Sequence, residues 1–224
     1  MKTVIFSDTH FDPWFEPKKY AYLARLIQQA DQVIINGDLW ESILWTFDEF
    51  IKSPWSGLFS LLKAKKTIYI YGNHDAIKFS DERVQLFSTR QVTEWKIQTE
   101  NKHYLIQHGD QYDLTFHKWS RHPIGKILAH NPLIVRGMLL TEKFCMRWLD
   151  IHYSQNQLQK FNQEIKQEIS GLLAPQEILI TGHTHSAEID EAHQFANSGF
   201  IRNGLAQYLE IDVAGALILH EDRY

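Results

Sequence analysis

The sequence predicts an α/β fold in which short buried strands alternate with amphipathic helices. Two observations lead to this prediction. Short apolar runs rich in β-branched and aromatic residues recur along the chain and end in polar residues, which is typical of strands. Segments with apolar residues every three or four positions lie between some of these runs and indicate helices. Strand, helix and strand in succession indicate a sheet with helices packed against it.

Five of the apolar runs are expected to be strands. They are apolar on both faces, so we expect them in the interior of a sheet. The runs are Thr3–Phe6, Val33–Ile35, Thr67–Tyr71, Tyr104–Ile106 and Ile178–Ile180. Near the end of the chain, Gly215 separates two further runs, 208–213 and 216–220, and this arrangement predicts a closing hairpin.

Three segments carry a helical pattern. Pro17 opens the first, in which apolar residues continue at helical spacing to Ala30. A shorter candidate covers Trp55–Leu62. The third is an amphipathic repeat from Leu158 to Leu172.

One region interrupts the alternation of strands and helices. From Tyr112 to Asp150 the strand signals stop, and six Lys and Arg stand against three acidic residues. The region is also rich in large apolar residues. We interpret residues 112–172 as a helical, lid-like insertion in a single domain that spans residues 1–224. The insertion is expected to be an amphipathic cap on the core, and the alternatives are a lid or a membrane-surface element for an acyl-bearing, anionic substrate.

The composition excludes several classes of protein. The chain has 44% hydrophobic residues and a net charge of −4, which argues against disorder and against a basic nucleic-acid binder. The single cysteine, Cys145, excludes an internal disulfide framework and a cysteine-built metal site. No run approaches the roughly 18 apolar residues of a membrane span, and the first apolar stretch is too short for a signal peptide. We therefore expect a cytoplasmic protein that binds no nucleic acid, with peripheral membrane contact through residues 112–150 left open.

Five short motifs occur at or just after predicted strand ends. In an α/β sheet, the loops beyond the carboxyl ends of the strands are where ligands usually bind, so motifs distant in sequence can converge there. Residues two apart in an extended segment point to the same side, so each His-containing pair can present two ligands. The motifs are Asp8-x-His10, Gly37-Asp38, Gly72-Asn73-His74-Asp75, His108-Gly109 and Gly182-His183-Thr184-His185.

These motifs supply the ligands of a metal site. Carboxylate, amide and imidazole groups without thiolates suit Mn²⁺, Fe, Co²⁺ or Zn²⁺. Two Asp, one Asn and four His are too many for one ordinary site and suit two adjacent metals that share a carboxylate. Paired metals roughly 3.5–4 Å apart clamp the attacking and leaving oxygens in hydrolytic enzymes. The expected chemistry is phosphoester hydrolysis, in which a metal-bridging hydroxide attacks phosphorus in line without a covalent intermediate.

His74 is the one motif histidine that we do not assign to metal. Its neighbour Asn73 is the expected ligand, so the imidazole of His74 points into the space beside the metals. There it can stabilise developing charge or protonate the leaving oxygen. Each motif residue taken singly also has an ordinary interpretation as a turn residue or a structural histidine. That interpretation does not explain why five motifs with compatible ligand chemistry occur together in this order.

The ordered motif set resembles the calcineurin-like metallophosphoesterase superfamily over residues 1 to about 200. The resemblance implies a four-layer αββα sandwich and a dinuclear metal centre. It implies two metal ions, with Mn²⁺ as first choice and Fe, Zn²⁺ or Co²⁺ as alternatives. Carried over by position, it implies one metal at Asp8, His10 and His185, a second at Asn73, His108 and His183, Asp38 as the bridge, and His74 near the leaving group.

The substrate class is less closely defined by the motifs. The run Gly37–Glu41, the run His108–Asp110 and the helical insertion are similar to those of UDP-2,3-diacylglucosamine pyrophosphatases. The chain differs from that family in two places. The family has Arg where this chain has His74, and it tends to have Arg-Pro where this chain has Ser186-Ala187. His74 is typical of general phosphomonoesterases and phosphodiesterases in the superfamily.

We therefore expect a metal-dependent phosphoesterase that acts on a phosphorylated small-molecule or lipid-linked substrate. Hydrolysis of an acylated nucleotide sugar is the first alternative. A non-catalytic binding protein on the same fold is the second, although every ligand position and His74 are filled in this sequence.

Overall fold

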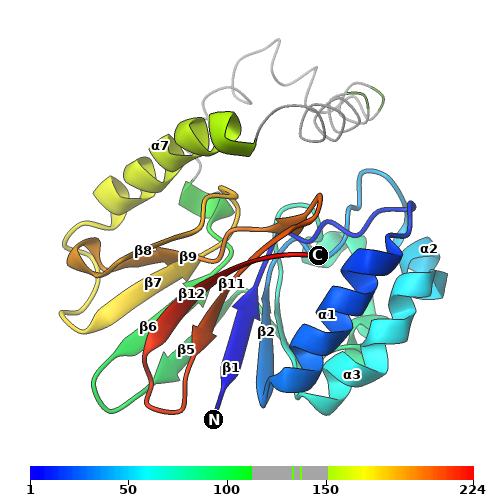
Figure 1. Ribbon diagram of the computed structural model, residues 1–224, viewed down its shortest axis with the longest axis horizontal. Helices are drawn as coiled ribbons and strands as arrows, with labels where there is room; N and C mark the ends of the chain where they lie inside the picture. The colour runs from blue at the N-terminus through cyan, green and yellow to red at the C-terminus, as the bar shows by residue number, and fades with distance from the viewer. Residues whose placement is uncertain (113–132, 134–136, 138–150) are drawn as a thin grey trace.

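Two β-sheets pack face to face, and helices cover the outer face of each (Figure 1). The computed structural model describes residues 1–112, 133, 137 and 151–224. Over these residues the layers run helix, sheet, sheet, helix. The predicted αββα sandwich is therefore confirmed.

The first sheet has seven strands in the order β10-β11-β1-β2-β3-β4, and β12 pairs with β11. Strands β1 to β4 are parallel, whereas β11 runs antiparallel to both β1 and β12. The strands are β1 (Thr3–Phe6), β2 (Gln32–Asn36), β3 (Ile68–Ile70), β4 (Arg90–Val92), β10 (Ile201–Arg202), β11 (Leu205–Ile211) and β12 (Leu217–Arg223).

The second sheet has five strands in the order β5-β6-β7-β9-β8. Its central strands β6, β7 and β9 are parallel, and the edge strands β5 and β8 are antiparallel to their neighbours. The strands are β5 (Glu94–Gln98), β6 (His103–Gln107), β7 (Glu177–Thr181), β8 (Glu188–Asp190) and β9 (Phe195–Asn197).

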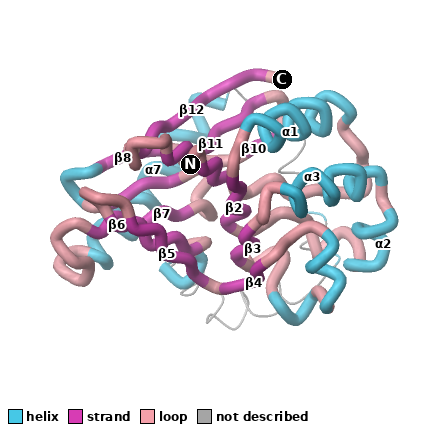
Figure 2. The backbone as a smooth tube through the Cα atoms, turned by 90° about the horizontal axis from the view of Figure 1, so that it is seen from below, coloured by secondary structure: helices cyan, strands magenta, loops and turns pink. Residues whose placement is uncertain are grey.

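Helices α1 (Pro17–Gln29), α2 (Phe47–Lys52) and α3 (Phe59–Ala64) lie on the outer side of the first sheet (Figure 2). Helix α7 (Ile151–Ile169) covers the second sheet. Local sequence explains two of the helix starts. Pro17 stands at the first position of α1, where its missing N–H costs nothing, and Thr46 and Glu49 form a capping box on α2. Short 3-10 turns complete the described chain at Pro54–Leu58, Ile77–Phe79, Glu82–Leu86, Asp110–Tyr112 and Glu191–His193.

Side-chain alternation along the strands separates three cores. In β1, Val4 and Phe6 face the helical layer, whereas Ile5 faces the second sheet. In β7, Ile180 faces the first sheet, whereas Leu179 packs under α7. Each buried strand therefore contributes to two cores, which is why the sequence shows continuous apolar runs there.

The structure confirms most of the predicted elements. The five predicted strands are β1, β2, β3, β6 and β7, and the predicted hairpin is β11–β12. The first predicted helix is α1, and the third is α7, which begins seven residues before Leu158. The second predicted helix, 55–62, is instead a 3-10 turn followed by α3, where Pro54 opens the turn.

Residues 113–132, 134–136 and 138–150 of the predicted insertion lie outside the described residues. Most of the range 112–150, for which membrane contact was left open, lies there too. No helix in the described part of the chain is long and apolar enough to cross a membrane.

Candidate metal centre

The eight predicted site residues meet where β1, β2, β3, β6 and β7 end. Each lies in the loop that directly follows one of these strands. Seven of them form two groups around Asp38, and His74 lies beside the first group. The site therefore lies at the seam between the two sheets, because β1 to β3 belong to one sheet and β6 and β7 to the other.

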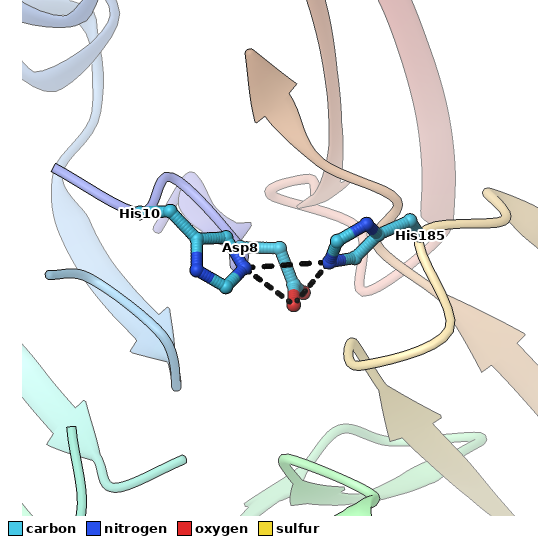
Figure 3. A group of neighbouring side chains, drawn as sticks. All are labelled: Asp8, His10 and His185. Carbon is cyan, nitrogen blue, oxygen red and sulfur yellow. Dashed lines mark hydrogen bonds and ion pairs between the residues drawn. The ribbon is translucent and has the colours of Figure 1, made fainter. Parts of the chain in front are cut away.

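The first group contains Asp8, His10 and His185 (Figure 3). The carboxylate oxygen Asp8 Oδ1 lies 3.1 Å from His185 Nε2 and 3.8 Å from His10 Nε2. The two imidazole Nε2 atoms are 3.4 Å apart. Three ligand atoms from two loops distant in sequence therefore face one point.

Asp8 Oδ1 is buried and has no hydrogen-bond partner among the described residues. The other oxygen, Oδ2, accepts a hydrogen bond of 3.0 Å from the His183 backbone N–H. The two imidazole nitrogens face this oxygen, at 3.1 and 3.8 Å. A buried carboxylate oxygen that accepts no hydrogen bond is costly, and a bound cation between these three atoms would satisfy it. The residues of this group therefore fit a divalent metal.

The second group contains Asp38, His108, His183 and Asn73. Asn73 Oδ1 lies 3.1 Å from His108 Nε2 and 3.1 Å from His183 Nδ1. Asp38 Oδ2 lies 3.3 Å from His108 Nε2 and also 3.8 Å from His10 Nε2 of the first group. One carboxylate oxygen therefore faces both groups.

The backbone is in the left-handed region at most of these positions. Eight non-glycine residues of the described chain have positive φ, and five of them are predicted ligands. Such residues cost on the order of 1–3 kcal/mol each and cluster at functional sites. Backbone hydrogen bonds hold the first two loops together. They run from His10 N–H to Asp38 O (2.9 Å) and from Asp8 N–H to Gly37 O (3.2 Å). The five ligands are Asp8, His10, Asp38, His183 and His185.

Two glycines permit the close approach of these loops. Gly37 has φ +84°, and a Cβ there would overlap the imidazole of His108. A Cβ on Gly182 would overlap Ser7 and the Asp8 carboxylate. Both positions therefore require glycine for a steric reason.

Neighbouring groups fix the orientation of the imidazoles. His108 Nδ1 donates to the backbone oxygen of Asn36 at 2.8 Å, which turns Nε2 toward the centre. His10 Nδ1 lies 3.0 Å from Glu41 Oε2, with the same effect on its Nε2. Partners of this kind orient metal-binding histidines and raise their basicity.

Glu41 also holds His74. Its other oxygen, Oε1, lies 2.8 Å from His74 Nδ1, so one carboxylate joins a predicted ligand to the predicted acid. The side chain of Glu41 is 3% exposed and that of His74 is 20% exposed. Glu41 therefore engages Nδ1 of His74 and not Nε2.

The charges of the site shift the pKa values of its residues. Burial opposes the charged form of His74, but the negative charges of Asp38 and Glu41 outweigh it and raise the pKa of His74 to about 9. Burial likewise opposes ionisation of Glu41, yet the charge of His74 and the hydrogen bond from His10 lower its pKa to about 2. The neighbouring histidines also lower the pKa values of Asp8 and Asp38 against the effect of burial, which favours the ionised carboxylates that metal ligation requires.

Three further buried residues support the site, and none of them has a role in the prediction from sequence. The first is Glu41, which holds two histidines. The second is Asp75, which accepts hydrogen bonds from the backbone N–H groups of Gly72 (2.7 Å), Leu39 (2.6 Å) and Asp38 (3.1 Å) and so ties two site loops together. Glu41 and Asp75 stand within or next to the quoted motifs, so their carboxylates were a usable signal.

The third supporting residue, Asn162, lies on α7 with no motif around it. Its Oδ1 accepts from Thr184 Oγ1 at 2.6 Å, and its Nδ2 donates to Ser186 O at 2.9 Å and to Glu188 Oε2 at 2.9 Å. It is fully buried. Helix α7 is therefore hydrogen-bonded to the loop that carries His183 and His185, and no local pattern in the sequence predicts this contact.

Similar solved structures cover nearly the whole chain at low sequence identity. A single mutant of Vps29 from Entamoeba histolytica is 14% identical, with a TM-score of 0.49 over 100% of this chain and 99% of that one. A novel archaeal phosphodiesterase is 17% identical, with a TM-score of 0.48 over 99% of each chain. The phosphoesterase YfcE from E. coli is 14% identical, with a TM-score of 0.48 over 100% and 99%.

Most of the chain matches one protein family. No curated protein matches the chain. The family described as calcineurin-like phosphoesterase, Metallophos, matches residues 1–187, a range that contains all eight predicted site residues. The chain therefore belongs to the calcineurin-like phosphoesterase family.

Proposed function

We propose that the protein is a metal-dependent phosphoester hydrolase that holds two divalent cations. One observation carries the proposal: two groups of ligand atoms face each other across Asp38 Oδ2, which lies 3.8 Å from His10 Nε2 and 3.3 Å from His108 Nε2. Asp8 Oδ1, buried without a hydrogen bond, is consistent with this assignment. The oxygen and nitrogen donors suit Mn²⁺ first, and Fe, Zn²⁺ or Co²⁺ as alternatives.

The residues divide into two ligand sets that share one member. When bound, two divalent cations would generate a hydroxide nucleophile near neutral pH and neutralise the charge of the phosphoryl group. The fixed orientation of the imidazoles keeps the ligand atoms in place before binding. We assign Asp8, His10 and His185 to one cation, Asn73, His108 and His183 to the other, and Asp38 to both.

We assign His74 to the leaving group. Glu41 holds its Nδ1, so the protonated ring presents Nε2–H as a donor toward the substrate. A donor in this position would stabilise charge on a phosphoryl oxygen or pass its proton to the departing oxygen. Since Glu41 also holds His10, the donor and one metal ligand keep a fixed relation to each other.

A hydrolysis panel with added Mn²⁺, run beside a metal-free control, tests the proposal. The panel contains p-nitrophenyl phosphate, bis-p-nitrophenyl phosphate, a cyclic nucleotide and UDP-2,3-diacylglucosamine. We expect Mn²⁺-dependent cleavage of the simple esters. Selective cleavage of the acylated nucleotide sugar would instead assign a pyrophosphatase, and no metal-dependent cleavage of any compound would support a non-catalytic binding protein.

A further inference from the structure

An apolar cavity of about 240 Å³ adjoins the proposed metal centre. One wall is helix α7, which contributes the apolar residues Leu158, Phe161 and Ile165 and the acidic residue Glu164. The opposite wall includes His183 and His185, one from each proposed ligand set. The cavity and the two ligand sets therefore share side chains.

Most of the helical wall is an apolar stripe, which Glu164 borders. Leu158, Phe161 and Ile165 are three and four residues apart, so they lie on one side of α7. Ile165 is buried and belongs to the core under the helix. Leu158 and Phe161 are half-buried and belong to none of the three cores, so their apolar surface faces the cavity.

Buried polar contacts fix this wall relative to the loop that carries His183 and His185, here called the metal loop. Asn162 is hydrogen-bonded to Thr184, which lies between His183 and His185 in the sequence, and to Ser186, which follows His185. One turn further along α7, Lys166 donates to Glu188 Oε1 at 2.7 Å and to Asp190 Oδ2 at 2.8 Å. A cavity whose two walls are tied together in this way is preformed, so a ligand need not order them on binding.

We propose that this cavity is a subsite for the organic group of the phosphoester, and that this group is a compact apolar one such as an aromatic ring or short alkyl chain. The inference rests on the proposed function, since the phosphoryl group must lie on the ligands that the cavity adjoins. A cavity of about 150 Å³ takes up benzene. The volume here therefore holds a substituted ring, and it is below the roughly 300 Å³ at which pockets for larger ligands begin.

Phosphonates test the subsite without any turnover. Titration calorimetry with the Mn²⁺-loaded protein compares methylphosphonate with benzylphosphonate. We expect benzylphosphonate to bind about 10- to 100-fold more tightly, the effect of burying one aromatic side chain. Leu158→Ala and Phe161→Ala should each reduce that advantage at least severalfold and leave methylphosphonate binding unchanged.

Leu172→Ala is the matched control, because Leu172 lies just beyond α7, is 74% exposed and does not line the cavity. We expect it to keep the full advantage of benzylphosphonate. Phe161→Leu, a milder change, keeps the test valid if Phe161→Ala does not fold. Butyl-, hexyl- and dodecylphosphonate test the size limit, since each methylene that enters the cavity should add about fourfold until the space is filled.

Several outcomes would overturn the subsite. Equal binding of methyl- and benzylphosphonate, or an advantage that both α7 variants retain, would show that the cavity does not take the organic group. If the affinity continues to rise from hexylphosphonate to dodecylphosphonate, the organic group is a lipid chain and not a compact one. If neither phosphonate binds and no ester is hydrolysed, the proposed function itself fails.

Discussion

Asp38 is the residue on which the two halves of the site depend. Its Oδ2 faces both ligand groups, while its Oδ1 accepts the His74 backbone N–H at 2.9 Å. The carboxylate thus fixes the His74 loop as well as the proposed metals. Burial opposes its ionisation, but the nearby histidines, His108 first, lower its pKa below the ordinary value for Asp.

Asp38→Asn should abolish hydrolysis. The amide keeps the shape of the side chain but removes the negative charge that two cations would share. We expect Mn²⁺ loading below two ions per chain, measured by elemental analysis, together with loss of p-nitrophenyl phosphate cleavage. Asp48→Asn is the control, since Asp48 is exposed and its ion pairs lie away from the site. Activity near that of the wild type in Asp38→Asn would exclude the bridging role.

His74→Ala should separate catalysis from metal binding. Loss of a positioned proton donor typically costs about 10²–10⁴-fold in rate. We expect a fall of that order in turnover with Mn²⁺ content unchanged, measured on the same samples. If His74→Ala loses both metals, His74 is itself a ligand.

Glu41→Gln should lower turnover and also weaken Mn²⁺ binding, because Glu41 holds His10 as well as His74.

Among the elements, α7 contacts the site without contributing a predicted ligand. It packs on the second sheet through Ile165 and Ile169, bonds to the metal loop through Asn162, and lines the cavity through Leu158 and Phe161. Its contribution to the site is thus one of position, since none of these residues is among the predicted ligands.

Asn162→Ala should weaken both the fold and the metal site. The change leaves the buried Thr184 hydroxyl and the Ser186 carbonyl without this partner, at a cost of about 1–3 kcal/mol in the free energy of unfolding. We expect a lower melting temperature and weaker Mn²⁺ binding by calorimetry. Gln163→Ala, at the next and exposed position, should change neither. Unchanged Mn²⁺ affinity in Asn162→Ala would limit Asn162 to a purely structural role.

The second attachment of α7, between Lys166 and Asp190, should depend on pH. Hydrogen bonds from Lys166 and from His193 lower the pKa of Asp190 from 3.8 to about 2. A lowered carboxyl pKa means that its stabilisation is present above about pH 4 and is lost as the pH falls through 2. Wild type should therefore be more stable than Asp190→Asn in chemical denaturation at pH 6. The difference should shrink toward pH 2, and a constant difference would contradict the assignment.

At the scale of the whole molecule, the site joins the two sheets. Asp8 and His10 follow β1 of the first sheet, whereas His183 and His185 follow β7 of the second. Between the sheets lies an apolar core that includes Ile5, which packs with residues of both sheets. Bound cations would therefore add a further link between two layers that already share this apolar core.

Removal of metal should lower the thermal stability of the molecule. A ligand that binds only the folded state at 100 times its dissociation constant adds about 2.7 kcal/mol to the free energy of unfolding. We expect the melting temperature to fall on chelation and to rise again with Mn²⁺ in a concentration-dependent way. Asp38→Asn should show a smaller rise. A melting temperature indifferent to Mn²⁺ would argue against a metal shared between the sheets.

The central strands and the loops of the candidate site can be predicted from local patterns in the amino-acid sequence. Apolar runs that must be buried on both faces identified the central strands, and glycine, Asp and His directly after them identified the loops of the site. Strands with mixed exposure, such as β5, were missed because alternating half-buried positions give a weak local signal. Helix α2 was missed for a related reason, since it is only six residues long.

Which of these residues contact one another depends on the three-dimensional packing of the chain. The His183 backbone bonds to the Asp8 carboxylate across 175 residues of sequence, and the Ser7 hydroxyl lies 2.8 Å from that of Ser198. Such contacts also bring Glu41 to both His10 and His74, and Asn162 of α7 to Thr184. They likewise form the cavity beside His185. Their physical cause is the packing of one sheet on the other. That packing depends on the fit of two whole apolar faces, and no window of the sequence contains both.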